Sequence, residues 1–164
     1  MTETRNDVGK LADLIADVDI AMLTTIGIDG VPHSRPMYTQ RRPFDGALYF
    51  FASRVSTKAD ELGADGRVNL SYASPKAQHY VSVSGTGTIV HDPALARELW
   101  NPLYRAWFPG GLDDPDLTLL RVDVERAEYW DSPSSAVVQL TGFIKAIATG
   151  ARADGGEHGT VGLQ

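Results

Sequence analysis

The 164-residue sequence predicts a mainly β domain in which six antiparallel strands form a small barrel with short peripheral helices. Three observations support this fold class. Apolar and polar residues alternate in several short segments, turn residues separate these segments, and helical spacing appears near both ends of the chain. Antiparallel strands of this number and spacing usually close into a barrel.

The first third of the chain is predicted to contain one helix and three strands. Apolar residues at helical spacing predict the helix over residues 7–19. Residues 20–39 predict two strands joined at Asp29-Gly30, a pair that tight primed hairpin turns prefer. After a second turn signal, RRPFDG, the run ALYFF at 47–51 predicts the third strand.

A short helix and two further strands are predicted in the middle of the chain. Ser56 is a favourable N-cap residue, so the helix is expected over residues 56–65. The runs RVNLSYAS at 67–74 and HYVSVSGTGTIV at 79–90 alternate in polarity, which predicts two strands. Gly85 in the second run suits a bulge or a sharp bend.

The last third begins with the dipeptide DP, an N-cap residue followed by proline, which predicts one or two helices extending through Trp107. The run LTLLRVDVERAEYW predicts a long strand at 117–130. Helical spacing returns at 134–150, and the Gly-rich, polar residues 151–164 predict a disordered tail. A single domain is therefore expected over residues 1–150.

The composition argues against several classes of protein. The formal net charge is −6 and the pI is about 5.1, which argues against general binding to DNA or RNA because nucleic-acid-binding surfaces are basic. The sequence has no cysteine, so disulfide and thiolate chemistry is excluded. No apolar run is long enough to cross a membrane and the N-terminus does not resemble a secretory signal, so a cytoplasmic location is expected.

The junction between the third strand and the next helix has the features of a site for one phosphate. An anion at a helix N-terminus meets unpaired backbone N–H groups and the positive end of the helix dipole. Ser56 and Thr57 add hydroxyl donors, Lys58 adds a positive charge, and Arg35 lies on a preceding strand that can reach the same point. The alternative is a structural role, in which Ser56 caps the helix while Lys58 and Arg35 are surface residues.

Other chemical motifs find little support in the sequence. The four histidines, His33, His79, His91 and His158, lack the spacing of a metal site. There is no G-x-S-x-G motif and no cysteine nucleophile, so covalent hydrolase chemistry is not expected. The sequence GTG at 85–87 falls within a strand instead of at a strand-to-helix turn, so it is not a dinucleotide-binding motif.

Aromatic residues are concentrated ahead of one predicted loop. Trp100, Tyr104, Trp107 and Phe108 cluster at helical spacing, which usually indicates core packing. Because the sequence FPGG starts a loop directly after Trp107, this side chain is expected on the wall of a cavity. Such a wall suits a flat ring such as an isoalloxazine.

Four stretches of the sequence occur in the order found in one known family. They are GVPHSRPM, FFASRVSTK, YVSVSGTGTIV and WFPGGLDDPDLTLLRVDVERAEYWD, and they lie within residues 8–133. In these stretches the chain resembles the pyridoxamine 5′-phosphate oxidase-like, FMN-binding split-barrel proteins, particularly their general stress protein 26 branch. The resemblance implies a split β-barrel that binds FMN, or FAD, at the interface of a homodimer.

The resemblance also implies which residues contact the flavin. By position in the family's motifs, Ser56 and Lys58 hold the FMN phosphate, and Met37 lies against the ring edge. Tyr80 faces the ring from the partner subunit. The expected cofactor-binding residues are Arg35, Pro36, Met37, Phe50, Phe51, Ala52, Ser56, Thr57, Lys58, His79, Tyr80, Trp107 and Trp130.

Two departures from the pyridoxamine oxidase pattern bear on activity. Gln40 stands where that enzyme has a lysine, and the region of its substrate-gripping arginine and histidine is here predicted as a helix that offers Lys145. Oxidation of pyridoxamine phosphate itself is therefore not expected. The leading hypothesis is a flavin-dependent oxidoreductase of unknown substrate, with no catalytic residue assigned. A non-catalytic flavin-binding stress or sensor protein and a deazaflavin-dependent reductase are the alternatives.

Overall fold

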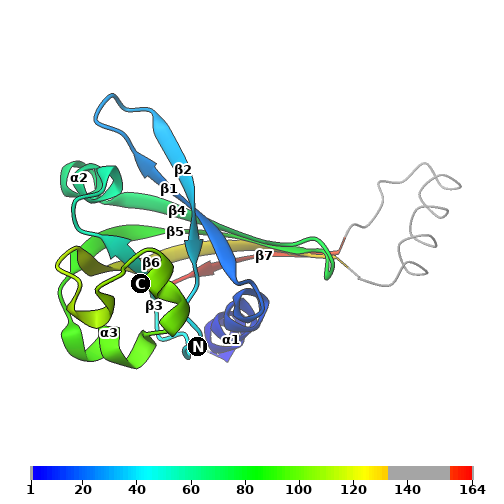
Figure 1. Cartoon of the computed structure of the whole chain (residues 1–164). Helices are drawn as coiled ribbons and strands as arrows, with labels where there is room; N and C mark the ends of the chain where they lie inside the picture. The colour runs from blue at the N-terminus through cyan, green and yellow to red at the C-terminus, as the bar shows by residue number, and fades with distance from the viewer. Residues whose placement is uncertain (1, 133–155, 164) are drawn as a thin grey trace, which may run out of the picture.

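The computed structural model describes residues 2–132 and 156–163, which contain three α-helices, two 3₁₀ helices and seven strands (Figure 1). The elements in chain order are α1 (Thr2–Ala16), β1 (Ile20–Ile26), β2 (Pro32–Tyr38), β3 (Ala47–Ser53), α2 (Thr57–Ala64), β4 (Arg67–Ser74), β5 (His79–Val90), α3 (Pro93–Leu99), η1 (Pro102–Ala106), η2 (Gly111–Asp113), β6 (Leu117–Asp131) and β7 (Glu157–Gly162). The mainly β class is confirmed, and the expected six strands are corrected to seven in the described residues. No helix among these residues has the length and apolar character needed to span a lipid bilayer.

The strands form one antiparallel sheet in the order β2-β1-β4-β5-β6-β3. β6 is long enough to pair with two strands along the same edge. Its residues 117–123 pair with β3, and residues 126–131 pair with β7. Within the described residues no hydrogen-bonded ladder joins β2 to β3, so the sheet does not close into a barrel.

β7 corrects the expectation of a disordered tail at 151–164 for residues 157–162, which form a strand. Val161 is 2% exposed and belongs to the hydrophobic core, and the Tyr129 hydroxyl donates a hydrogen bond to Glu157 at 2.9 Å. A Cβ atom at Gly159 would lie 2.4 Å from the Tyr129 ring, so a glycine lets β7 approach this side chain. Gly159, one of the glycines that led to the prediction of disorder, therefore allows β7 to pack closely against Tyr129. The helix predicted at 134–150 lies outside the described residues.

The hairpin between β1 and β2 forms at the predicted place but with a different turn. The Gly27 carbonyl accepts the Gly30 N–H at 2.8 Å, and the Gly27 N–H donates to the Val31 carbonyl at 2.8 Å. Gly30 has φ +81°, whereas Asp29 does not have a positive φ. A primed turn of type I′ needs positive φ at both central residues, so the expectation of a tight primed turn is wrong. The connection is a longer loop closed by a left-handed glycine.

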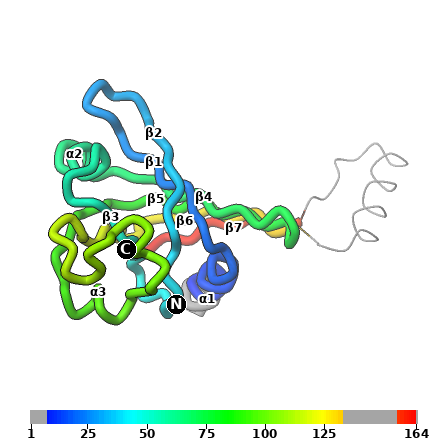
Figure 2. Tube along the Cα trace, viewed as in Figure 1, coloured from blue at the N-terminus to red at the C-terminus, as the bar shows by residue number. Residues whose placement is uncertain are grey.

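The core lies between the sheet and α1, which covers the sheet near β5 and β7 (Figure 2). Leu11, Leu14 and Ile15 of α1 are buried against alternating strand residues such as Leu70 and Val83. This helix starts and ends earlier than the predicted 7–19. The alternation in the sequence therefore identified the buried face of the strands correctly.

The register between β5 and β6 shifts between Ser84 and Gly85, as the sequence predicted for a bulge or bend there. A Cβ atom at Gly85 would lie 2.1 Å from the backbone oxygen of Asp123. Because no side chain fits in this space, the glycine permits the close approach of the two strands.

Candidate functional site

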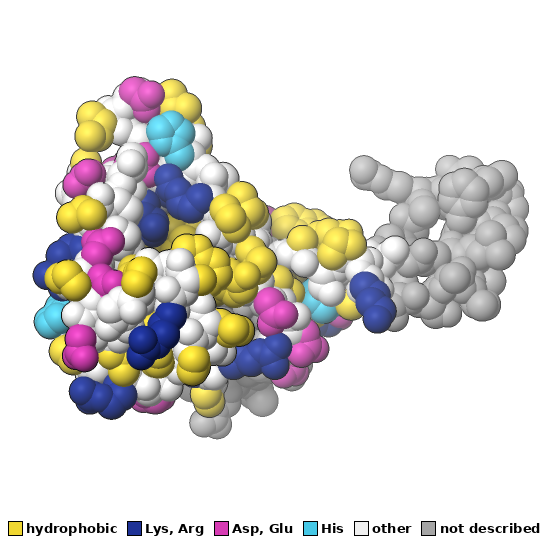
Figure 3. Space-filling view, viewed as in Figure 1, with side chains coloured by type: hydrophobic (Ala, Val, Ile, Leu, Met, Phe, Trp, Pro, Cys, Tyr) yellow, Lys and Arg dark blue, Asp and Glu magenta, His cyan; other side chains and the backbone are white. Residues whose placement is uncertain are grey.

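A cavity of about 260 Å³ lies between β2, β3, the start of α2 and the segment around η1. Its lining residues are Pro36, Met37, Tyr38, Gln40, Phe51, Ala52, Ser53, Lys58, Tyr104, Trp107 and Phe108. It thus occupies the open side of the sheet, where β2 and β3 face each other without a ladder. On the face in Figure 3, Lys and Arg side chains border a hollow beneath the projecting β1–β2 hairpin, beside hydrophobic surface.

The walls of this cavity are rich in aromatic rings. The Phe51 ring packs against Tyr104 with ring centroids 4.9 Å apart, and the Tyr38 and Trp107 centroids lie 5.4 Å apart. The Tyr104 ring also contacts Trp100, at 5.8 Å. Trp107 remains 58% exposed, which agrees with the expectation that it lies on a cavity wall instead of in the core. These faces offer a stacking surface for a flat ring.

Lys58 is the charged residue in the lining of this cavity, and it is partly buried. Within residues 2–132 and 156–163 its ammonium group forms no ion pair and no hydrogen bond. Burial and the neighbouring charge of Arg35 lower the pKa of Lys58, and the carboxylate of Asp116 opposes this shift. The protein thus holds a partly buried positive charge in this cavity with no carboxylate in direct contact, and the negative charge of a ligand would stabilise it.

Arg35 lies close enough to affect Lys58, but its guanidinium is already engaged by protein groups. It donates to Glu61 at 2.8 Å and to the Thr25 hydroxyl. The Glu61 side chain is only 2% exposed and also contacts His33 Nδ1 at 2.8 Å. The Thr25 hydroxyl donates to Glu61 and, with the His33 and Arg35 hydrogen bonds, lowers the Glu61 pKa to about 2 although burial opposes it. We call these four residues the Glu61 cluster.

The residues at the start of α2 occupy the predicted positions. Ser56 is the N-cap residue, but its hydroxyl donates to the Ser53 carbonyl at 2.7 Å and does not accept a helix N–H. Thr57 begins the helix and is exposed. Lys58 therefore reaches the cavity from the first turn of α2. The hydroxyl proton of Ser56 is already used in the hydrogen bond to the last residue of β3.

The remaining predicted residues, His79, Tyr80 and Trp130, lie far from this cavity within one chain. Tyr80 pairs with Trp130 near the tip of the β4–β5 hairpin, which extends away from α2 and α3 (Figure 1). Trp130 is 42% exposed and stacks on His158 of β7, with ring centroids 5.1 Å apart. The Nε2 atom of His79 is buried and has no hydrogen-bond partner among the described residues.

Comparison with known protein families identifies the family of the chain. A family model described as pyridoxamine 5′-phosphate oxidase like matches residues 6–154, which is most of the chain. The chain belongs to this family. The resemblance of the four sequence stretches is thereby confirmed at the level of the family.

Three proteins are similar to this pyridoxamine 5′-phosphate oxidase-like chain in sequence or structure. The general stress FMN/FAD binding protein of Xanthomonas citri is 34% identical, with a TM-score of 0.70 over 80% of this chain and 92% of that chain. A protein of Jannaschia sp. assigned to general stress protein 26 has a TM-score of 0.78 and 26% identity over 97% of this chain and 99% of that one. Protein bli-3 of Neurospora crassa is 32% identical over 63% of this chain, which spans about half (53%) of bli-3.

The structure thus separates the predicted residues into three groups and one further residue, Phe50. Six of them line the cavity: Pro36, Met37, Phe51, Ala52, Lys58 and Trp107. Arg35, Ser56 and Thr57 lie beside it, and His79, Tyr80 and Trp130 lie at the far end of the sheet. Phe50 is 1% exposed and points to the core side of β3, because successive strand residues face opposite ways.

Sequence reasoning missed Tyr38 on the cavity wall and Glu61 in the buried cluster. A signal for Glu61 was present, since Lys58, Glu61 and Leu62 share one face of a short helix by their i, i+3 and i+4 spacing. Because Leu62 is buried, Glu61 next to it on the same face could have been expected to be buried and to need a partner for its charge. Tyr38 had no comparable signal in the sequence.

Proposed function

We propose that this protein binds FMN, with FAD as the alternative, in the cavity between β2 and β3. The observation that carries the proposal is Lys58, a partly buried cation without a partner in the described residues, in a cavity whose other walls are apolar and aromatic. The phosphate is the counter-charge for Lys58, and the nearby positive charge of Arg35 also favours an anion there. The isoalloxazine ring lies against Tyr38, Phe51 and Trp107.

The proposal includes a homodimer with flavin at the subunit interface. The cavity of about 260 Å³ is smaller than the roughly 300–1,000 Å³ of sites that enclose a ligand of this size. Aromatic side chains are exposed both at its rim, on Tyr38 and Trp107, and at the hairpin end, on Tyr80 and Trp130. A second copy that covers the rim with its hairpin end would complete the site and remove both surfaces from water.

The activity proposed is that of a flavin-dependent oxidoreductase in the stress response. The flavin, when bound, supplies reversible electron transfer, and the protein supplies phosphate anchorage, ring orientation and exclusion of water. The described cavity lining contains no carboxylate and no imidazole. This feature favours a second candidate, a flavin-binding stress or sensor protein without turnover. Oxidation of NAD(P)H above the free-flavin background would distinguish the enzyme from the binding protein.

Titration with FMN and with riboflavin tests the site, because the two ligands differ only in the phosphate. For Lys58→Ala we expect the Kd of FMN to rise about 10- to 150-fold, corresponding to about 1.5–3 kcal/mol for a hydrogen bond to a charged group. The riboflavin Kd should stay the same. Arg97→Ala, which removes an exposed cation from α3 outside the cavity lining, is the control. Equal losses for both flavins, or no loss for FMN, would contradict the proposed phosphate site.

A further inference from the structure

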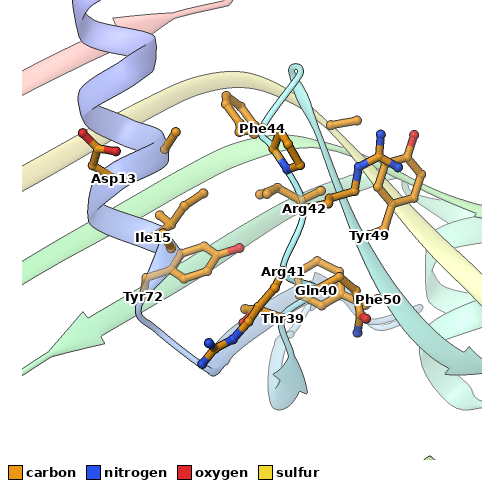
Figure 4. A pocket seen from close by; sticks show the side chains of 15 residues that line it. Asp13, Ile15, Thr39, Gln40, Arg41, Arg42, Phe44, Tyr49, Phe50 and Tyr72 are labelled. Atoms are coloured by element: carbon orange, nitrogen blue, oxygen red, sulfur yellow. The ribbon is translucent and has the colours of Figure 1, made fainter. Parts of the chain in front are cut away.

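A second cavity, of about 160 Å³, lies on the other side of β3, between α1 and the segment that joins β2 to β3 (Figure 4). Its walls are mostly apolar, with Ile15 from α1, Phe44 from the connecting segment and Phe50 from β3. It lies apart from the flavin cavity and shares only Gln40 with its lining. The proposed function gives it no role.

The hydroxyl of Tyr72, a residue in the lining of this cavity, is not used by the protein. Tyr72 is 2% exposed, and Figure 4 shows its ring entering beside α1 with the hydroxyl directed toward the connecting segment. In the described part of the chain this hydroxyl has no hydrogen-bond partner. Burial raises the pKa of Tyr72, so the group stays protonated and remains a donor. The hydroxyl is therefore a donor that the fold leaves available to an acceptor in the cavity.

Arg42 places a second unpaired donor in the lining. Its Nε atom is buried without a partner among the described residues, although a terminal nitrogen contacts Asp45 at 3.1 Å. The guanidinium also stacks over the Tyr49 ring, 5.0 Å from the centroid. Its Nε–H can only donate, and the Tyr72 hydroxyl can donate as well. The cavity therefore calls for a molecule that carries an acceptor.

Charge and size narrow the class of ligand further. Arg42 is paired with Asp45, and Arg41 is paired with Asp19 at 2.9 Å. Because the charge of each arginine in the lining is already balanced by a carboxylate, the cavity does not favour an anion. A volume of about 160 Å³ is close to the roughly 150 Å³ of an apolar cavity known to bind benzene.

We propose that this cavity binds a neutral, benzene-sized cyclic carbonyl compound, whose carbonyl oxygen accepts the Tyr72 hydroxyl. The apolar body of the ligand fills the space between Ile15, Phe44 and Phe50. The site is independent of flavin, because the cavity has its own unpaired donor and lies on the opposite side of β3.

Cyclohexanone is the probe for this site, and the full-length chain is titrated while the methyl signals of Ile15 are followed by NMR. We expect saturable shifts with wild type and about five- to tenfold weaker binding to Tyr72→Phe, the effect of one neutral hydrogen bond. Ala12→Leu, which fills the cavity from α1, should abolish the shifts. Lys58→Ala should bind cyclohexanone like wild type, since its substitution affects the other cavity.

Two comparison ligands decide the chemistry of the site. Cyclohexane has the same body without an acceptor, and we expect it to bind wild type and Tyr72→Phe equally. Cyclohexanecarboxylate carries a charge and should bind more weakly than cyclohexanone. The absence of saturable shifts with cyclohexanone would overturn the proposal. Equal cyclohexanone affinity for wild type and Tyr72→Phe would overturn it as well, as would a preference for the carboxylate. Because Tyr72→Phe removes only an unpaired hydroxyl, it should unfold at the same temperature as wild type or higher.

Discussion

Arg35 and Lys58 bring two positive charges to the same end of the sheet, yet their surroundings differ. The guanidinium of Arg35 is bound by the buried Glu61 and by Thr25, so the fold itself uses this charge. The ammonium of Lys58 has no partner in the described residues, and the charge of Arg35 helps to lower its pKa. The comparison teaches that a cation near a cavity is evidence for an anionic ligand only when the protein leaves it unpaired.

This difference separates effects on stability from effects on binding. Removing a member of the Glu61 cluster leaves another buried group uncompensated, so the folded state is expected to lose stability. Removing Lys58 takes away a charge that the apoprotein holds at a cost, so only affinity for a phosphate-bearing ligand should fall. The Lys58→Ala titration proposed above tests the second half of this comparison.

The largest effect is expected for Glu61→Ala, which leaves Arg35 partly buried without its carboxylate. We expect the free energy of unfolding to fall by about 3–5 kcal/mol, the usual cost of breaking a buried ion pair by removing one partner. Urea denaturation at neutral pH measures this loss. Glu98→Ala on α3 removes an exposed glutamate and should change stability by no more than about 0.5 kcal/mol. A similar small change for both variants would show that the Glu61 cluster does not stabilise the fold.

The next effect concerns pH and the charge of Lys58. Its pKa in the folded protein is lowered from the ordinary 10.5, so the charged form is complete only below that lowered value. The affinity for FMN relative to riboflavin should therefore decline as the pH rises, beginning below pH 10.5. The full decline should equal the loss seen in Lys58→Ala, about 10- to 150-fold. Ionisation of the flavin ring affects both ligands and cancels in the ratio.

Lys58→Arg is the matched control for this titration because a guanidinium stays charged throughout the range. In this variant the ratio of the two affinities should be independent of pH. If wild type and Lys58→Arg show the same decline, the titrating group is not Lys58. Linkage adds an independent measurement, since the unliganded protein should gain stability as the pH rises toward 10.5 and Lys58 loses its charge.

The sequence predicted the strands better than it predicted the site. The bounds of β4 and β5 agree with the predicted 67–74 and 79–90, because strict alternation identifies a strand with one buried face. The seventh strand was missed because its glycines indicate disorder unless the Tyr129 ring beside Gly159 is known. The local sequence pattern therefore predicted the strands whose formation depends on their own residues. It failed for β7, whose formation depends on contact with a side chain distant in the sequence.

The same distinction between local pattern and distant contacts explains which properties of Arg35 and Lys58 could be predicted. The sequence placed Arg35 and Lys58 near one phosphate, and the structure brings them close enough for their charges to interact. Nothing in the local sequence shows that Glu61, separated from Arg35 by strand β3, has already engaged the arginine. An ion pair between a strand and a helix depends on how the two pack, which one sequence without relatives does not reveal.

The smallest effect is expected for His33→Ala, at the exposed side of the Glu61 cluster. The His33 side chain is 45% exposed, and Thr25 and Arg35 still satisfy Glu61 when it is removed. We expect a loss of about 0.5–1.5 kcal/mol in urea denaturation, the range for one ordinary hydrogen bond.

A double-mutant cycle sharpens this last prediction. In the Glu61→Ala background, His33→Ala should cost nothing, because its partner is already gone. His33→Asn, which keeps a side-chain donor, should recover part of the loss in the wild-type background. If His33→Ala costs the same with and without Glu61, the histidine acts through the β1–β2 hairpin and not through the carboxylate. The Glu61 cluster would then be limited to Thr25, Arg35 and Glu61, with Lys58 still the unpaired cation beside it.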